Sequence, residues 1–232
     1  MHFNSVYHPD GMTTDTLRRL EAARRELAEA TQALSLKHGG GEWERWRAAY
    51  QNCLTLERDL ARSLDEECAV EIGWPAPWDT GAPLPHVLSS GRRTFIVYNQ
   101  SERDPHWDGS YAQVVDPRTP EMRLIATVEF EHCLVHKFGS PNDEVLEGHR
   151  LHGKGLSGYR AHVVERSAWL KEIEQINSVH PQYDPASWTG LTHYVLPFHD
   201  QTFECIAKGH VLKESLSTFA EALAACTRLL LG

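Results

Sequence analysis

The sequence has 232 residues, of which 41% are hydrophobic and 24% are charged. These values are typical of a soluble globular protein with one large domain, or one domain and an appendage. The formal net charge of −9 disfavours nonspecific nucleic-acid binding, which needs a basic surface, so we do not expect a nucleic-acid partner.

The sequence shows no sign of a membrane segment or a disulfide framework. No apolar run approaches the roughly 20 residues that a membrane-spanning helix needs. The N-terminal segment MHFNSVYHPDG lacks the basic and apolar parts of a signal peptide. The cysteines are odd in number and widely spaced, which indicates free thiols. We therefore expect a cytoplasmic protein without a membrane partner.

Two helices are predicted in the N-terminal third, at residues 13–37 and 42–68. The first carries a narrow leucine stripe and ends at a run of glycines, and the second carries an apolar face that begins at Trp43. Together they resemble an antiparallel helical hairpin. Such a hairpin either packs on the main domain or mediates homo-oligomerisation or partner binding. A strict coiled coil is poorly supported, because Arg24 and Thr31 occupy alternate heptad positions.

A change in composition marks the end of the hairpin. Residues 72–85 are rich in Pro, Gly and Trp, which predicts an irregular segment packed on the surface. We therefore divide the chain into a tail and helical hairpin (1–72), a Pro/Trp-rich connector (73–90) and a main domain (91–232).

The main domain is predicted to contain six strands and two longer helices. The strands are expected at residues 94–98, 111–115, 124–138, 159–165, 191–198 and 202–207. Ser167 is expected to cap one helix, and residues 212–230 are predicted to form a closing amphipathic helix. Because strands and helices alternate without a βαβ repeat, the fold class is α+β, with a mostly antiparallel sheet covered by helices.

The longest of these strands carries two histidines. From Val128 the residues alternate, which places His132 and His136 on one face. In a strand they would lie roughly 13 Å apart, too far to share a zinc ion with bonds of about 2.0–2.1 Å, whereas a helix would bring them together. Because residues 124–138 are long for one strand, we expect a bulge or bend inside it.

A short helix is predicted directly after this strand. Ser140 is a suitable N-cap, Pro141 suits the first helical position, and acidic residues follow. Gly148 is expected to end the helix after about two turns.

The loop from Gly148 to Gly155 is the first candidate for chemistry. It matches G-x-x-x-x-G-K, but Gly155 stands where a P-loop needs Ser or Thr, and the loop follows a short helix instead of a strand. A P-loop is therefore disfavoured. Its cationic and imidazole side chains could still hold an anion, and the alternative is a mobile surface loop.

The second candidate lies where two predicted strands meet, at His199 and Asp200. With His132 or His136 these residues could form a metal site, or a base with an orienting acid. The alternative is that Asp200 caps a turn and His199 bonds to the backbone. Cys133 and Cys205 are weaker candidates for a nucleophile, because buried cysteine is usually a small apolar residue.

The leading hypothesis is a small-molecule-binding α+β protein with a His-rich pocket, which would be a hydrolase or lyase acting on an anionic substrate if it is an enzyme. The catalytic candidates are His132, His136, His199 and Asp200. The substrate-binding candidates are Asp143, His149, Arg150, His152 and Lys154. Loop residues that could form the rim are Trp107, Asp108, Asn142, Asp143 and Glu144.

Two questions stay open from the sequence alone. A divalent metal is a candidate cofactor, but no ligand set is fixed. The rival hypothesis is a non-enzymatic protein-binding or immunity-type module, in which the helical hairpin is the working surface and the histidines are structural.

Overall fold

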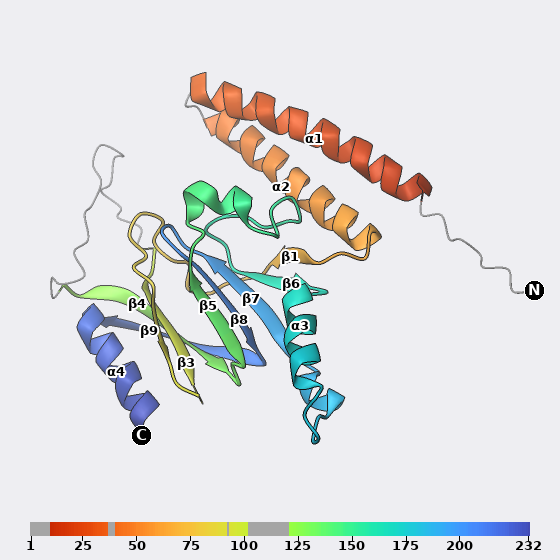
Figure 1. Ribbon diagram of the computed structural model, residues 1–232. Coiled ribbons are helices and arrows are strands. Elements are labelled where there is room, and N and C mark those ends of the chain that lie inside the picture. The colour runs from red at the N-terminus through yellow and green to blue at the C-terminus, as the bar shows by residue number, and fades with distance from the viewer. Residues whose placement is uncertain (1–9, 37–39, 92, 102–120) are drawn as a thin grey trace, which may run out of the picture. The chain divides into compact units, whose positions relative to one another are not determined.

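A computed structural model of the chain describes residues 10–36, 40–91, 93–101 and 121–232 (Figure 1). The chain divides into two units. The first contains the residues up to Val70 together with Arg150–Ser157, and the second contains Glu71–His149 and Gly158–Gly232. Two antiparallel sheets and four α-helices confirm the α+β class. In the described ranges, no helix combines the length and the apolar character needed to cross a membrane.

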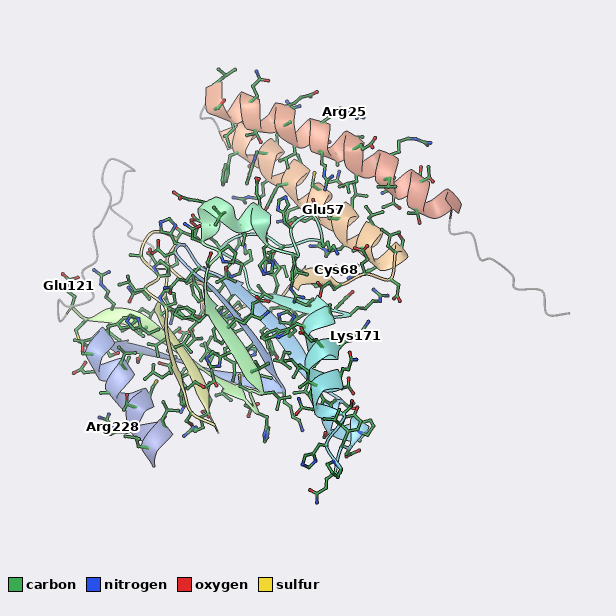
Figure 2. The ribbon with its side chains drawn as sticks, in the orientation of Figure 1. Arg25, Glu57, Cys68, Glu121, Lys171 and Arg228 are labelled. Carbon is green, nitrogen blue, oxygen red and sulfur yellow. The ribbon has the colours of Figure 1, made fainter. Side chains whose placement is uncertain are left out.

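The first unit contains the helical hairpin that the sequence predicted. Helices α1 (Asp10–Leu36) and α2 (Gly40–Ser63) lie antiparallel, side by side (Figure 1). Their interface buries Leu20, Ala23, Cys53 and Leu56. Glu57, labelled in Figure 2, also accepts a hydrogen bond of 3.2 Å from Arg24 across the two helices.

The loop at residues 150–157 belongs to this first unit and is held there by polar contacts. Lys154 forms an ion pair of 2.7 Å with Glu66, and Arg150 one of 3.2 Å with Glu67. The Lys154 carbonyl accepts a hydrogen bond of 2.9 Å from the Ala69 N–H. At Gly155, φ is +89°, and an added Cβ would lie 2.5 Å from the Cγ of Arg58 and 2.6 Å from the Ala69 carbonyl oxygen. A glycine is therefore required at this position.

The substitution Gly155→Ala is expected to lower the free energy of unfolding by at least about 1–2 kcal/mol, because it adds a steric clash to a left-handed backbone. Urea unfolding followed by circular dichroism measures the loss. The control is Gly41→Ala, where an added Cβ meets nothing within 4 Å. A Gly155→Ala protein as stable as the control variant would show that the loop packs differently.

The second unit contains two sheets. The first sheet has the order β2-β3-β4-β9, with every pair antiparallel. Its strands are β2 (His86–Ser89), β3 (Thr94–Asn99), β4 (Arg123–Glu131) and β9 (Gly209–Ser217). Helix α4 (Phe219–Leu231) covers one face, where Phe219, Ala222 and Cys226 pack with Phe95 and Ile125.

In the second unit, the second sheet has the order β6-β7-β8-β5. Its strands there are β6 (His162–Glu165), β7 (Thr192–Pro197), β8 (Thr202–Ala207) and β5 (Val135–Gly139). Strand β1 (Cys68–Glu71) is where the chain passes from the first unit to the second. Side chains of both sheets meet in one core, which includes Tyr98 and Phe130 from the first sheet and Leu196 and Phe203 from the second.

Three shorter elements complete the second unit. They are the 3₁₀ helices η1 (Asp143–Gly148) and η2 (Pro185–Trp188) and the α-helix α3 (Ala168–Asn177). Ser167 caps α3 as predicted, because its Oγ accepts a hydrogen bond from the Leu170 N–H.

The prediction that the closing helix begins at residue 212 is wrong. Residues 209–217 form strand β9, which pairs with the whole of β4, and helix α4 begins only at Phe219. Thr218 starts the helix through a capping box with Glu221. Strands β1 and β2 were not predicted either, because their residues were assigned to the end of a helix and to the connector. The strand predicted at 111–115 lies outside the described residues.

The predicted strand at 124–138 is in fact two strands. The backbone breaks at His132, where φ is +49°, so β4 belongs to one sheet and β5 to the other. The expected bend is thus confirmed. The expectation that His132 and His136 share one strand face is wrong, because the turn separates them.

The helix that follows β5 begins later than predicted. Helix η1 starts at Asp143, after Asn142, so Ser140 is not its cap, and the Ser140–Pro141 bond is cis. Gly148 is its last residue, which agrees with the expected end.

Candidate functional site

The turn between β7 and β8 forms the centre of the candidate site. Phe198 N–H donates a hydrogen bond of 2.8 Å to the Gln201 carbonyl, so His199 and Asp200 are the two central residues of a tight turn. The segment after β5 runs beside it. Asp143 N–H donates to the His199 carbonyl at 2.9 Å, and Thr202 Oγ1 donates to the Pro141 carbonyl at 2.8 Å. These backbone contacts bring Asp143 beside His199.

Three side chains meet at this position. The Oδ2 atom of Asp143 lies 2.9 Å from Nδ1 of His199. The Tyr159 hydroxyl donates to the same oxygen and lies 3.1 Å from the same ring nitrogen. A carboxylate can only accept hydrogen bonds, so Nδ1 of His199 carries the proton and Nε2 is the acceptor of the neutral ring. The arrangement is therefore a base with an orienting acid.

The same contacts set the protonation of the cluster. The hydrogen bond from Tyr159, followed by that from His199, holds the pKa of Asp143 below its ordinary value. Burial, followed by the hydrogen bond to Asp143, raises the pKa of Tyr159, so its phenol stays protonated at neutral pH. The hydrogen bond to Asp143 raises the pKa of His199 above 6.5. The hydrogen bond therefore favours the protonated form of His199.

The cluster is open to solvent on the side of the histidine. The His199 side chain is 39% exposed. Within the described residues, its Nε2 atom has no hydrogen-bond partner. A water molecule or a small ligand can therefore reach the imidazole.

A cavity of about 420 Å³ lies at the same turn. It is lined by Asp200 and Gln201 from the turn, by Phe138 from β5, and by residues 84–87, which lead into β2. Its volume is within the range of about 300–1,000 Å³ that is common for small-molecule sites. Asp200 thus lines the cavity while its neighbour His199 belongs to the Asp143 cluster.

The other histidines predicted on the long strand lie elsewhere. The His136 ring on β5 stacks on Phe203 with ring centroids 6.2 Å apart. His132, in the turn between β4 and β5, lines a separate cavity of about 370 Å³ that also includes His180, Trp188 and Lys208.

The predicted anion-binding residues fall into two groups. His149 is buried in the second unit, where its Nε2 lies 3.5 Å from Glu204. Arg150, His152 and Lys154 belong to the first unit, and the two cations are ion-paired there. Their part in holding an anion stays a prediction. Trp107 and Asp108 lie outside the described residues.

A second polar cluster lies inside the second unit, around Glu204 of β8. Its Oε2 atom is 2.9 Å from Nε2 of His193, and Nδ1 of His193 is 2.9 Å from Oγ of Ser167. The order Ser–His–Glu is that of a hydrolytic triad. However, His193 is only 1% exposed and Glu204 only 7%, and Ser167 already caps α3. A substrate cannot reach this serine, so the cluster is structural.

Electrostatics agree with a structural role for this cluster. Burial opposes ionisation of Glu204, but hydrogen bonds from His149 and His193 outweigh it and hold the pKa of Glu204 well below its ordinary value. A buried carboxylate with two imidazole partners ties β8 to β7 and to the segment after η1.

The sequence pointed to His199, Asp143 and His149 as separate candidates, but it did not reveal Tyr159 or the contact of His193 with Glu204. The signal at Glu204 was a single acid in the otherwise apolar run 202–207, because such an acid needs a buried partner. Tyr159 carried no such signal. Its backbone has φ of +58°, and its N–H donates to the Pro197 carbonyl, which fixes it beside the turn.

The metal hypothesis gains no support from the geometry. Across the part of the chain that the structure describes, no three or more His, Cys, Asp or Glu side chains are grouped so that they could hold a metal ion.

Comparison with protein-family models, with curated proteins and with solved structures gave no match. The function is therefore argued from the site itself.

The substitution Glu204→Ala is expected to lower the free energy of unfolding by about 3–5 kcal/mol, because it removes the buried carboxylate that the imidazoles of His149 and His193 share. The measurement is urea unfolding at pH 7. Glu172→Ala on the exposed face of α3 is the matched control and should change stability little. Equal effects of the two substitutions would show that Glu204 is not a stabilising centre.

The pH dependence of stability follows from the same carboxylate. The stabilisation from Glu204 is fully present above its ordinary pKa of 4.5 and is lost as the pH falls toward its lower pKa in the folded state. The conservative variant Glu204→Gln should therefore show a flatter loss of stability below pH 4.5 than the unsubstituted protein. Parallel curves would exclude this linkage.

Proposed function

We propose that the protein is a small-molecule hydrolase in which His199 is the general base. The observation that carries the proposal is the Asp143–His199–Tyr159 cluster, with a histidine that is held through Nδ1 and whose side chain is 39% exposed. In this role His199 removes a proton from water as the water attacks the substrate. The same base could instead remove a proton from carbon, so a lyase is the nearest alternative reaction.

The three residues have distinct parts in this reaction. Asp143 holds the imidazole in the tautomer with a free Nε2 and stabilises the imidazolium that forms. Tyr159 donates to Asp143 and so fixes the carboxylate without taking the proton from His199. The anion-binding pair predicted from the sequence, Arg150 and Lys154, is not needed for these steps.

Two variants test the base. His199→Ala should lower the rate of hydrolysis at least about 100-fold for small chromogenic probes, namely p-nitrophenyl acetate and alanine p-nitroanilide. The matched control is His180→Ala, which removes an exposed histidine from the separate cavity. Equal activity of the two variants, or no hydrolysis above background by the unsubstituted protein, would contradict the proposal.

The pH profile tests the acid partner. In Asp143→Asn the pKa of His199 should fall toward 6.5, because the anionic partner that raises it is lost. Activity that depends on the neutral imidazole rises with pH through this pKa, so its rising limb should move to lower pH in the variant. Proton NMR titration of the imidazole gives the pKa directly. An unchanged pKa would show that Asp143 does not hold His199 in solution.

The helical hairpin supports a second candidate function, which is the binding of a protein partner. Trp43 on α2 is 45% exposed and stacks on Trp46, whose ring in turn stacks on Tyr50. Exposed aromatic side chains of this kind are common at binding surfaces. This candidate predicts that Trp43→Ala weakens partner binding and leaves hydrolysis unchanged.

A further inference from the structure

The cavity beside His199 has an acidic character that defines a ligand class. Asp200 is an exposed residue that lines the cavity, and no ion pair with Asp200 is found within the described residues. No lysine or arginine is among the described residues that line the cavity. The Asp200 carboxylate would therefore repel an anion in the cavity and attract a cation.

His86 also lines the cavity and has a ring nitrogen that can accept a hydrogen bond. Nδ1 of His86 lies 2.9 Å from the Leu84 carbonyl oxygen, and a carbonyl can only accept. Nδ1 therefore carries the proton, which leaves Nε2 of the neutral ring as an acceptor. Asp200 and His86 together match a ligand group with several N–H donors. A primary ammonium has three such donors and the required positive charge.

The remaining walls are apolar. Leu84, Pro85, Val87 and Phe138 line the cavity, and Phe138 is 37% exposed. Covering such a surface releases water and favours an apolar group on the ligand. The face of Phe138 can also attract a nearby cation.

We propose that this cavity binds a small apolar primary amine, with Asp200 as the counter-ion of its ammonium group. This inference rests on the proposed function only where it makes the amine-containing ligand the substrate that His199 helps to hydrolyse. The neighbouring positions of His199 and Asp200 in one tight turn place the base next to this cavity. The ligand class differs from the anionic substrate that the sequence suggested.

Ligands of similar size and different charge test the proposal. Isothermal titration calorimetry measures the binding of phenethylamine, 2-phenylethanol and 3-phenylpropanoate to the full chain at pH 7. Phenethylamine should bind at least tenfold more tightly than 3-phenylpropanoate, with the neutral alcohol between them. Equal or tighter binding of the carboxylate would overturn the proposal.

Variants locate the interaction. Asp200→Asn should weaken phenethylamine binding five- to tenfold and should leave 2-phenylethanol binding unchanged. Glu172→Gln removes one negative charge from an exposed position on α3, and it should change the binding of neither phenethylamine nor 2-phenylethanol. Phe138→Leu, which keeps an apolar wall, should weaken the amine only two- to threefold. An Asp200→Asn protein that binds phenethylamine as well as the Glu172→Gln protein would overturn the assignment.

The binding assay separates this inference from the proposed function. Charge-selective binding that depends on Asp200 upholds the amine site even if His199→Ala has no effect on hydrolysis. Hydrolysis that depends on His199 without any preference for the amine overturns the amine site alone.

Discussion

The break in the chain at His132 is the constraint on which the second unit depends. Strand β4 ends at Glu131 in the first sheet, and β5 begins at Val135 in the second. Because one run of chain serves both sheets, β5 is fixed as the edge partner of β8. The segment that follows β5 must then pass the turn at the start of β8. This is how Asp143 comes to lie beside His199.

The two polar clusters of the second unit use similar residues in opposite environments. Around Glu204, a carboxylate and imidazoles are buried, and their hydrogen bonds hold strands and a helix end together. Around Asp143, a carboxylate holds an imidazole whose side chain is partly exposed to solvent. Both contain an acid–histidine contact of 2.9 Å. Solvent access to the histidine, and not the acid–histidine contact itself, therefore distinguishes a structural cluster from one that can take part in a reaction.

The sequence predicted those parts of the fold in which local pattern and burial agree. The leucine stripe of α1 repeats with the helical period, and β3, β7 and β8 are short, nearly continuous buried runs rich in apolar residues. Strand β9 was mistaken for helix because its apolar residues are few and its pairing with β4 is a distant contact. A local pattern carries no information about such a partner.

The candidate site was predictable only in part, for the same reason. His199 and Asp143 each stood out as polar residues at the ends of predicted elements. They lie 56 residues apart in the sequence, so their contact depends on the path of β5 and not on either segment alone. Tyr159 could not be found, because its role arises from where the backbone places it.

The central claim is that Asp143 fixes His199 as a base with a free Nε2 atom. The tautomer of His199 tests it most directly, and nitrogen-15 NMR of labelled protein above the pKa of His199 measures it. Our account predicts that the ring is protonated at Nδ1, and that this preference is lost in Asp143→Ala. A ring protonated mainly at Nε2 in the unsubstituted protein, as in free histidine, would contradict the account.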